Sequence, residues 1–365
     1  MASRQKNIGT EKGSATRKKR AVASGRYSRG SGLCRRPTAE SGKSSSEIAE
    51  TPIAEATETR DELTDVMGCL KSNSTDYGSR DNWLRARTNG IGASDAAVVL
   101  GESDWDSPLS LYAKKIGLTP LDESESLAME IGRGMEAVAA NIYERYTGRE
   151  VFDLGAYTIQ RHKQFPFLTC TLDRVICDHE KGWGVCNLKC VGGAKSGDWE
   201  TAAPRVYWIQ EQAEMLVTGL KWASLGVIVS NYDFRWIDIP RDDDFIDNTL
   251  LPALIRFWGH VQCRIAPKPD GHTATSKALS KLYQAEDGST LILPGEFYDL
   301  DVELLQLKQS IAEQESRKNW IENRIKAAIG FATTGLLPGT ARYTWQLQGV
   351  AGGNYARVLR RKSVA

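Results

Sequence analysis

The sequence predicts an α/β fold in which helices flank a mixed β-sheet, and three observations lead to this class. Helix-like and strand-like segments alternate between about residues 81 and 265, in the order helix, strands, hairpin, helix, strands, helix. The segment Trp222–Ser230 has the continuous apolar content of a buried strand. The chain of 365 residues is also long enough to bury a sizeable core. We therefore expect one α/β core with further elements attached to it.

The N-terminal part of the chain lacks the pattern of a folded domain. Its first 36 residues hold eleven Lys or Arg against a single Glu, and residues 37–82 lean acidic and are rich in Ser and Thr, while the whole chain has a net charge of only +1. Neither part shows helical or strand periodicity or enough apolar residues to offset the entropy of ordering. Residues 1–78 are therefore predicted to be a disordered arm. Its basic cluster Arg17–Arg20 fits a nuclear address, a phosphate-binding arm or a tail without function.

Two segments after this arm predict the start of the core. Residues 81–87 are typical of a short helix, and residues 88–94 of a loop that leads into a helix over 95–100, with Ser94 as a candidate N-cap. The stretch Leu127–Tyr146 predicts a longer helix with an apolar stripe that includes Leu127 and Ile131, and Gly148 ends it. Glu136 lies beside this stripe, on a flank with small neighbours, so its carboxylate is expected to be packed and to need a partner.

The remaining elements are predicted from apolar periodicity and from Pro and Gly residues that mark the ends of helices and strands. The expected helices are Pro108–Gly117, Pro204–Gly219 and Phe245–Cys263, and the expected strands are two short runs in Val151–Gln160, then Trp222–Ser230 and Phe234–Ile239. After residue 268 a 3-4 apolar spacing from Leu304 to Ala328 predicts a long amphipathic helix that packs on the core or on a partner, since polar interruptions argue against a continuous coiled coil. A closing hairpin over 340–361 ends in a basic tip. We divide the chain into 1–78, 79–268 and 269–365.

No run of about 18 apolar residues and no signal-peptide pattern occurs, so we expect an intracellular, cytoplasmic protein with no membrane segment. The seven cysteines contain no CxxC pair. Four of them, Cys170, Cys177, Cys186 and Cys190, cluster on the central hairpin, but strand alternation places Cys177 on one face and the other three on the opposite face. Ligands from two faces do not converge on an iron-sulfur cluster, so these residues are predicted to be small buried hydrophobes.

The central feature is a hairpin between Leu168 and Cys190. Its two β-rich runs are joined by a polar turn near Glu180, so Asp173 is expected opposite Asn187. Strand alternation places Asp173, Asn187 and Lys189 on one face, where a carboxylate, an amide and an amine converge. On the helix that follows, Tyr207, Gln210 and Glu214 share a face.

An Asp on one strand followed by acid-x-Lys on the next resembles the PD-(D/E)-x-K nucleases, and the surrounding sequence resembles the YqaJ-type viral recombinases, the family of phage lambda exonuclease. The resemblance covers roughly residues 81–265 and rests on three further motifs: Arg87 to Ser94 matches an R-x6-S segment, residues 132–136 match G-x-x-x-E, and Tyr207 with Gln210 matches a Tyr-x2-Gln signature. The chain departs at one point, because Asn187 stands where the second acid is expected.

The resemblance implies a restriction-endonuclease-like core and a nuclease domain over residues 79–268. It implies Mg²⁺ or Mn²⁺ bound by Glu136, Asp173 and Asn187, with Lys189 and Gln210 acting on the attacking water. Arg87 and Ser94 would bind a DNA phosphate, as the N-terminus of a helix also can. The expected substrate is the end of double-stranded DNA, degraded 5′ to 3′, with a single-strand annealing protein as partner and a homo-oligomer as a possible assembly.

Two alternatives remain open at this point. Asn187 removes one negative charge from the metal site, which fits a protein that binds DNA ends without cutting them. The periodicity of residues 300–330 also fits a coiled-coil adaptor.

Overall fold

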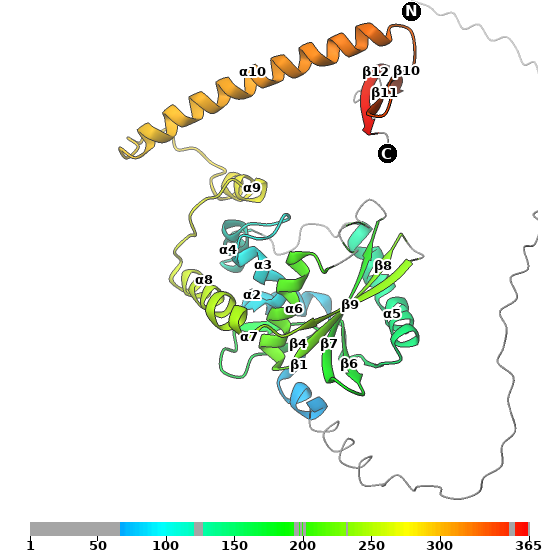
Figure 1. The fold of residues 1–365 in the computed structure, drawn as a ribbon. Helices are drawn as coiled ribbons and strands as arrows, with labels where there is room; N and C mark the ends of the chain where they lie inside the picture. Colours follow the sequence, from blue (N-terminus) through cyan, green and yellow to red (C-terminus); the bar gives the residue numbers. More distant parts are fainter. Residues whose placement is uncertain are drawn as a thin grey trace, which may run out of the picture. The chain divides into compact units, whose positions relative to one another are not determined.

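A mixed five-stranded sheet carries the predicted hairpin at its centre. The structure, a computed structural model, describes residues 66–119, 127–192, 197, 199, 202–230, 233–349 and 355–363. The sheet has the order β3-β6-β7-β8-β9, in which β7 and β8 run parallel and the other neighbours antiparallel. The strands are β3 (Glu150–Phe152), β6 (Arg174–Asp178), β7 (Gly182–Val191), β8 (Trp222–Val229) and β9 (Asp233–Pro240). This mixed sheet between helices confirms the predicted α/β class (Figure 1).

The hairpin formed by β6 and β7 has the predicted register. Arg174 pairs with Cys186, so one further step along both strands sets Asp173 opposite Asn187. The first predicted run is divided, however, because Leu168–Cys170 forms strand β5 in a second sheet of order β1-β4-β5-β2. The other strands of that sheet are β1 (Ser74–Asp76), β2 (Ile91–Gly92) and β4 (Thr158–Arg161). Asp173 therefore lies in the link between two sheets, at the start of β6.

Helices α5 (Leu127–Thr147) and α6 (Arg205–Thr218) pack against opposite faces of the five-stranded sheet (Figure 1). Cys186 and Leu188 on β7 are buried in the cluster that contains residues of α5, whereas Val185 belongs to the cluster that contains residues of α6. Because side chains alternate along a strand, Asn187 and Lys189 share the α6 side with Val185.

The apolar stripe predicted for α5 packs only in part. Met135 and Ile142 of that stripe pack against the sheet with the buried Ala139 and Tyr143, whereas Leu127, Ile131 and Val138 are exposed. The small side chain of Ala139 lets the helix approach the sheet closely, and Tyr143 fills the neighbouring space. The predicted length of the helix is correct, and its predicted buried face is correct only near Met135 and Ile142.

The folded core begins earlier than the predicted boundary at residue 79. Residues 66–72 are helical, Leu70 is 4% exposed within the main core, and Ser74–Asp76 pairs with β4. This part of the predicted disordered arm is thus ordered, because its few apolar residues find distant partners that local periodicity does not reveal. The rest of the arm, residues 1–65 with the basic cluster, lies outside the described residues.

The other helices surround the second sheet and the end of the core. They are α2 (Arg80–Thr88), η1 (Ala93–Asp95), α3 (Ala96–Val99), α4 (Pro108–Lys115), α7 (Asp243–Phe245), η3 (Ile246–Leu250), α8 (Leu251–Cys263) and α9 (Thr273–Leu282). Helix α9 was not predicted; it packs on α4, where Thr275 Oγ1 donates to Ser107 Oγ at 2.8 Å. This contact extends the core beyond the predicted boundary at residue 268.

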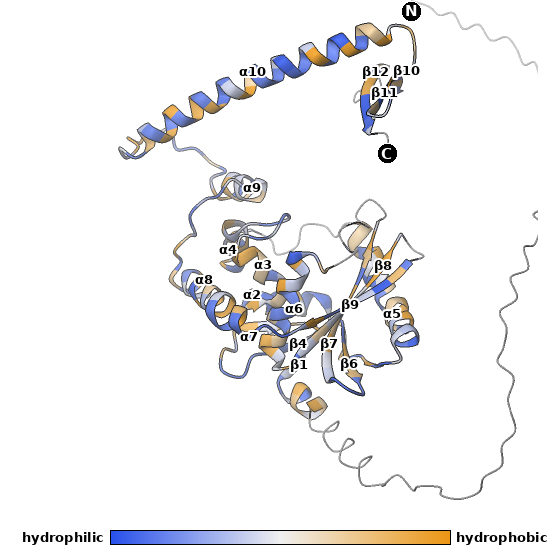
Figure 2. Cartoon of the chain, viewed as in Figure 1, coloured by the Kyte–Doolittle hydropathy of each residue, from blue (hydrophilic) through white to orange (hydrophobic). Residues whose placement is uncertain are grey.

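The C-terminal extension consists of α10 (Phe297–Ile329) and a three-stranded sheet of β10 (Thr334–Leu337), β11 (Ala341–Gly349) and β12 (Tyr355–Ser363). Within the described chain no residue of α10 is buried, and apolar and polar residues alternate along its length (Figure 2). Its packing partner therefore stays a prediction. In the basic tip, Arg357 stacks 3.7 Å above the Trp345 ring and donates to the carbonyl of Gly330, so this arginine has a structural role.

Candidate active site

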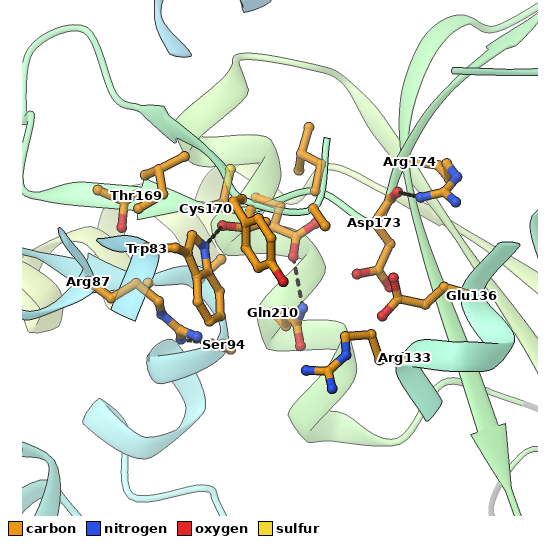
Figure 3. A pocket seen from close by; sticks show the side chains of 18 of the residues that line it. Trp83, Arg87, Ser94, Arg133, Glu136, Thr169, Cys170, Asp173, Arg174 and Gln210 are labelled. Carbon is orange, nitrogen blue, oxygen red and sulfur yellow. Dashed lines mark hydrogen bonds between the residues drawn. The ribbon is translucent and has the colours of Figure 1, made fainter. Parts of the chain in front are cut away.

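A cavity of about 240 Å³ lies where α2, η1, α5, the β5-β6 link and α6 meet. Figure 3 shows its side chains, with Arg87 and Ser94 at one end and Glu136 and Asp173 at the other. Six of the seven candidate residues come together around this cavity: Arg87, Ser94, Glu136, Asp173 and Gln210 line it, and Lys189 contacts Asp173. The seventh, Asn187, is fully buried directly behind it.

The carboxylates of Glu136 and Asp173 form the acidic end of the cavity and point toward one another (Figure 3). Asp173 Oδ2 accepts hydrogen bonds from the Leu188 backbone N–H at 2.9 Å and from Lys189 Nζ at 3.3 Å. These bonds fix the aspartate to strand β7. Burial, and next the charge of Asp173, raise the pKa of Glu136 to about 7. This pair of acids therefore favours a cation between them.

Asn187 connects the acidic end with helix α6. Its Nδ2 donates to Glu214 Oε2 at 2.7 Å, and its Oδ1 lies 3.4 Å from both Lys189 Nζ and Gln210 Nε2. Gln210 Nε2 also donates to Glu214 Oε1 at 2.8 Å. The predicted neighbourhood of Gln210 and Lys189 is thus observed. Glu214 was missed as a candidate, although its place on the Tyr207–Gln210 face was a usable signal.

Lys189 stays charged in this setting. Burial by itself lowers the pKa of its ammonium group, but the carboxylates of Asp173, Glu211 and Glu214 outweigh that effect and hold the pKa above its usual value. The same side chain lies 6.0 Å from the centre of the Tyr207 ring. Lys189 therefore acts as a fixed hydrogen-bond donor beside the acids.

Helix α6 brings two buried carboxyl groups toward this face of the sheet. Burial is the main cause that raises the pKa of Glu214, to about 7, and it raises the pKa of Glu211 well above its usual value. Only Glu214 lines the cavity, and neither oxygen of Glu211 has a hydrogen-bond partner among the described residues.

The opposite end of the cavity is basic. Arg87 Nη2 donates to Ser94 Oγ at 2.8 Å, and the guanidinium group lies 4.7 Å from the centre of the Trp83 ring. Lys115 Nζ contacts Asp95 at 2.8 Å and donates to the Arg87 backbone carbonyl at 2.9 Å. Two cations thus surround one carboxylate, which leaves this end with a net positive charge that suits a phosphate.

Ser94 does not act as the predicted N-cap. Ser94 lies inside η1. The carboxylate of Asp95 instead accepts the hydrogen bond of the Gly92 backbone N–H, at 3.0 Å, at the start of this turn. The hydroxyl of Ser94 remains exposed beside Arg87, so the R-x6-S spacing does bring its two ends together.

Glycines shape both sides of the cavity. A Cβ at Gly90 would lie 2.4 Å from the backbone oxygen of Phe167, so only glycine fits in the loop that leads to η1. Gly132 and Gly134 on α5 differ, because nothing lies within 4 Å of the place of their missing Cβ atoms. The expected close packing at this flank of Glu136 is therefore observed at Ala140, which is buried against the sheet, but not at Gly132, where open space lies beside the acid.

The donor set fits a hard divalent cation. Glu136 and Asp173 present carboxylate oxygens to the cavity, which is the ligand type that Mg²⁺ prefers, and Mg²⁺ keeps several waters when proteins bind it. The amide oxygen of Asn187 lies behind the cavity, 3.4 Å from Lys189 Nζ and from Gln210 Nε2. Within the described ranges, no three His, Cys, Asp or Glu side chains are grouped closely enough to hold a metal ion. Of the four hairpin cysteines, Cys170 and Cys186 are buried as predicted, and Cys177 and Cys190 are half-buried.

Comparison with known proteins places this site in a family. Residues 82–221 match the model of the YqaJ-like viral recombinase domain. The chain is 31% identical over 273 residues to the uncharacterized protein YqaJ of Bacillus subtilis strain 168, covering 73% of this chain and 83% of that protein. The chain belongs to the YqaJ-like family, which confirms the resemblance seen in its motifs.

Two solved structures have lower similarity. The alkaline exonuclease LHK-Exo from Laribacter hongkongensis is 20% identical, covers 51% of this chain and 94% of its own, and has a TM-score of 0.42. A phage-related exonuclease from Haemophilus somnus 129PT is 14% identical, covers 48% and 96%, and has a TM-score of 0.37. No helix among the described residues is long and apolar enough to span a membrane.

Proposed function

We propose that this protein is a metal-dependent DNA exonuclease of the phage or prophage recombination type, which hydrolyses phosphodiester bonds from duplex ends. One observation carries the proposal: a single cavity has two facing carboxylates beside a half-buried lysine at one end and an Arg-Ser pair with net positive charge at the other. An enzyme that cuts DNA needs both kinds of group, because it hydrolyses one phosphodiester bond while it binds another phosphate of the same strand.

Glu136, Asp173 and the amide oxygen of Asn187 would hold Mg²⁺ or Mn²⁺. Such an ion supplies polarisation of the scissile phosphate and a water of lowered pKa. The residues of the chain do the rest. Lys189, fixed by Asp173, donates to the oxygen on which charge develops, and Gln210 keeps the amide and the lysine in place.

Arg87 and Ser94 would bind the phosphate at a 5′ end, which sets the direction of digestion as 5′ to 3′. A clamp of this kind positions DNA and carries no sequence information. The strand left behind would pass to a single-strand annealing protein. We place this activity in the cytoplasm of a bacterial or phage-infected cell, and a homo-oligomer would help the enzyme stay on its substrate.

A second candidate function is a DNA-end-binding protein that does not cut. Asn187 favours it, because the site has one carboxylate fewer than the family pattern and lacks a group of three acidic or metal-ligating side chains within the described chain. In this candidate function the Arg87–Ser94 end still binds a DNA phosphate, but the acidic end does not support cleavage.

Digestion of a linear duplex with 5′-phosphate ends separates the two functions. The expected result is degradation in Mg²⁺ or Mn²⁺, with Mn²⁺ giving the faster rate because it tolerates a less charged ligand set. DNA should stay intact in EDTA, and a closed circular duplex should stay intact in either metal. If the linear duplex survives both metals at micromolar protein but is retained in a gel shift, the end-binding function is the correct one.

A further inference from the structure

Glu214 lies directly behind Asn187, on the helix that covers this face of the sheet. The residue is 1% exposed, yet its side chain lines the cavity. Oε2 accepts the hydrogen bond from Asn187 at 2.7 Å and Oε1 the one from Gln210 at 2.8 Å. A carboxylate thus stands one hydrogen bond away from the position where the family pattern has an acid.

The neighbours of Asn187 determine which way its amide points. A carboxylate accepts hydrogen bonds and an ammonium group only donates them. Since Glu214 lies on one side of the amide and Lys189 on the other, the amide nitrogen faces Glu214 and the oxygen faces Lys189. The distances agree, at 2.7 Å to Glu214 and 3.4 Å to Lys189 Nζ. Both neighbours therefore favour the same orientation.

We infer that Glu214 is a positioning residue of the metal site, which holds the Asn187 oxygen toward Lys189 and supplies from α6 the negative charge that Asn187 lacks. The inference rests on the proposed function, because it concerns the metal site of that nuclease. A carboxylate behind a metal-binding side chain fixes its orientation and strengthens it as a ligand. An asparagine backed by a buried glutamate then replaces the acid of the acid-x-Lys pattern.

An amide at position 214 would not replace the carboxylate. Glu214 accepts from two donors, Asn187 and Gln210, through its two oxygens. A glutamine side chain has one oxygen and one NH₂ group, so it can accept at only one of these places and would turn a donor toward the other. Either Asn187 or Gln210 must then rotate, and a rotated Asn187 would present its NH₂ group to Lys189.

The inference also predicts the effect of restoring an acid on β7. Asn187→Asp, which is isosteric, would bring two carboxylates into contact at a distance where the wild type has a 2.7 Å hydrogen bond, so they would repel each other. Combining it with Glu214→Gln reverses the direction of the same bond, because the amide at position 214 would donate to the carboxylate at position 187. The double change keeps the charge of the site and moves it from helix to strand.

The test is a double-mutant cycle on the full chain, read by Mn²⁺ binding. Free Mn²⁺ is measured by electron paramagnetic resonance, and the Mn²⁺-induced shift in Tm gives a second readout that needs no catalysis. Glu214→Gln should weaken Mn²⁺ binding by about tenfold to a hundredfold, the usual effect of losing a partner behind a metal ligand. Asn187→Asp should also weaken it, because its carboxylate and that of Glu214 repel each other and one of them takes up a proton. The double variant should bind more tightly than either single variant.

Glu211→Gln is the matched control. Glu211 lies on the same helix and is 0% exposed, and its charge also raises the pKa of Lys189, but it does not line the cavity. Glu211→Gln removes a neighbouring charge and leaves the hydrogen bonds of Glu214 to Asn187 and Gln210 in place, so its loss of Mn²⁺ affinity should be clearly smaller than that of Glu214→Gln. Circular dichroism checks that each variant is folded.

Three outcomes would overturn the inference. Glu214→Gln could bind Mn²⁺ as tightly as the wild type, Glu211→Gln could lose as much affinity as Glu214→Gln, or the two single losses could simply add in the double variant. Each of these leaves the proposed function standing as long as the wild type binds Mn²⁺ and digests DNA. A wild type that does neither would overturn both.

Discussion

Two polar clusters lie on opposite faces of the same sheet and differ in how their charges are balanced. On the α5 side, Arg149 donates to Asp178 at 2.7 Å, to Asp238 at 2.6 and 2.7 Å, and to the Tyr143 hydroxyl at 2.8 Å. Although burial by itself raises the pKa of Asp238, hydrogen bonds from Arg149, then Lys181 and Ser224, bring it down to about 2. This cluster satisfies its own charges.

The cluster on the α6 side does the reverse. Glu136, which reaches this cluster from α5, faces Asp173, and the pKa values of Glu136 and Glu214 are raised to about 7, in both cases mainly by burial. Lys189, Arg174 and Arg133 all lower the pKa of Glu136, but they do not offset the effect of burial and of Asp173. The comparison teaches that a closed network of charges holds the fold together, whereas carboxyl groups of raised pKa around a cavity indicate a functional site, here the one proposed to bind a metal ion. Substitutions in the two clusters should therefore have opposite effects.

The largest effect is expected from Asp173→Ala and Lys189→Ala. Each should lower the rate of DNA digestion by about a hundredfold or more, since several kcal/mol of charge stabilisation corresponds to at least two powers of ten. Rates on linear duplex in Mn²⁺ measure this, with circular dichroism as the control for folding. Full activity in either variant would show that the hairpin is not the active site.

Arg149→Met should have the opposite pattern. It keeps the aliphatic stem above the Trp222 ring but leaves Asp178 and Asp238 without their cation, so Tm should fall by about 4–10 °C. The digestion rate at 25 °C should stay within about twofold, because no residue of the cavity is touched. A loss of activity in the folded variant would mean that the two clusters are coupled.

A smaller effect concerns Arg87, at the basic end of the cavity. Arg87→Ala should reduce the preference for 5′-phosphate over 5′-hydroxyl ends by about tenfold, as one charge-assisted contact is lost, and should leave the rate of cutting after engagement nearly unchanged. Competition between the two kinds of end measures the preference. If the wild type shows no preference, Arg87 does not hold a terminal phosphate.

The smallest effect is a stability difference that depends on pH. Between the usual Glu pKa of about 4.3 and the folded value of about 7, the folded wild type binds more protons at Glu136 than the unfolded chain, so this group lowers stability as pH rises. Glu136→Gln has no titrating carboxyl group at this position, so it does not lose stability in this way as pH rises. In EDTA its Tm should equal the wild-type value near pH 5 and exceed it by about 1–3 °C at pH 8, a modest gain because Glu136 is partly exposed. A variant less stable than the wild type at pH 8 would contradict the raised pKa.

Local sequence rules predicted the parts of the site that depend on neighbours along the chain. The turn after Asp178 and strand alternation were enough to set Asp173 opposite Asn187, and family spacing was enough to bring Arg87 to Ser94. Neither result needs knowledge of how helices pack. The same holds for the lengths of α5 and α6, whereas α10 begins at Phe297, before the apolar spacing that predicted it.

The parts that were not predicted depend on contacts between distant segments. Leu168–Cys170 pairs with β4 and β2 instead of continuing into β6, and Leu70 enters the core from a segment that has no periodicity. Glu214 reaches Asn187 only because α6 lies flat on this face of the sheet. Spacing on a helix shows which residues share a face, but it does not show which strand or helix that face packs against.

Calorimetric titration of Mn²⁺ into the metal-free protein at pH 8 tests the central contrast most directly. The contrast predicts saturable binding that Asp173→Ala abolishes and that Arg149→Met leaves within about twofold. Absence of saturable binding in the wild type, or binding that survives Asp173→Ala, would show that the acids on the α6 side do not form a metal site.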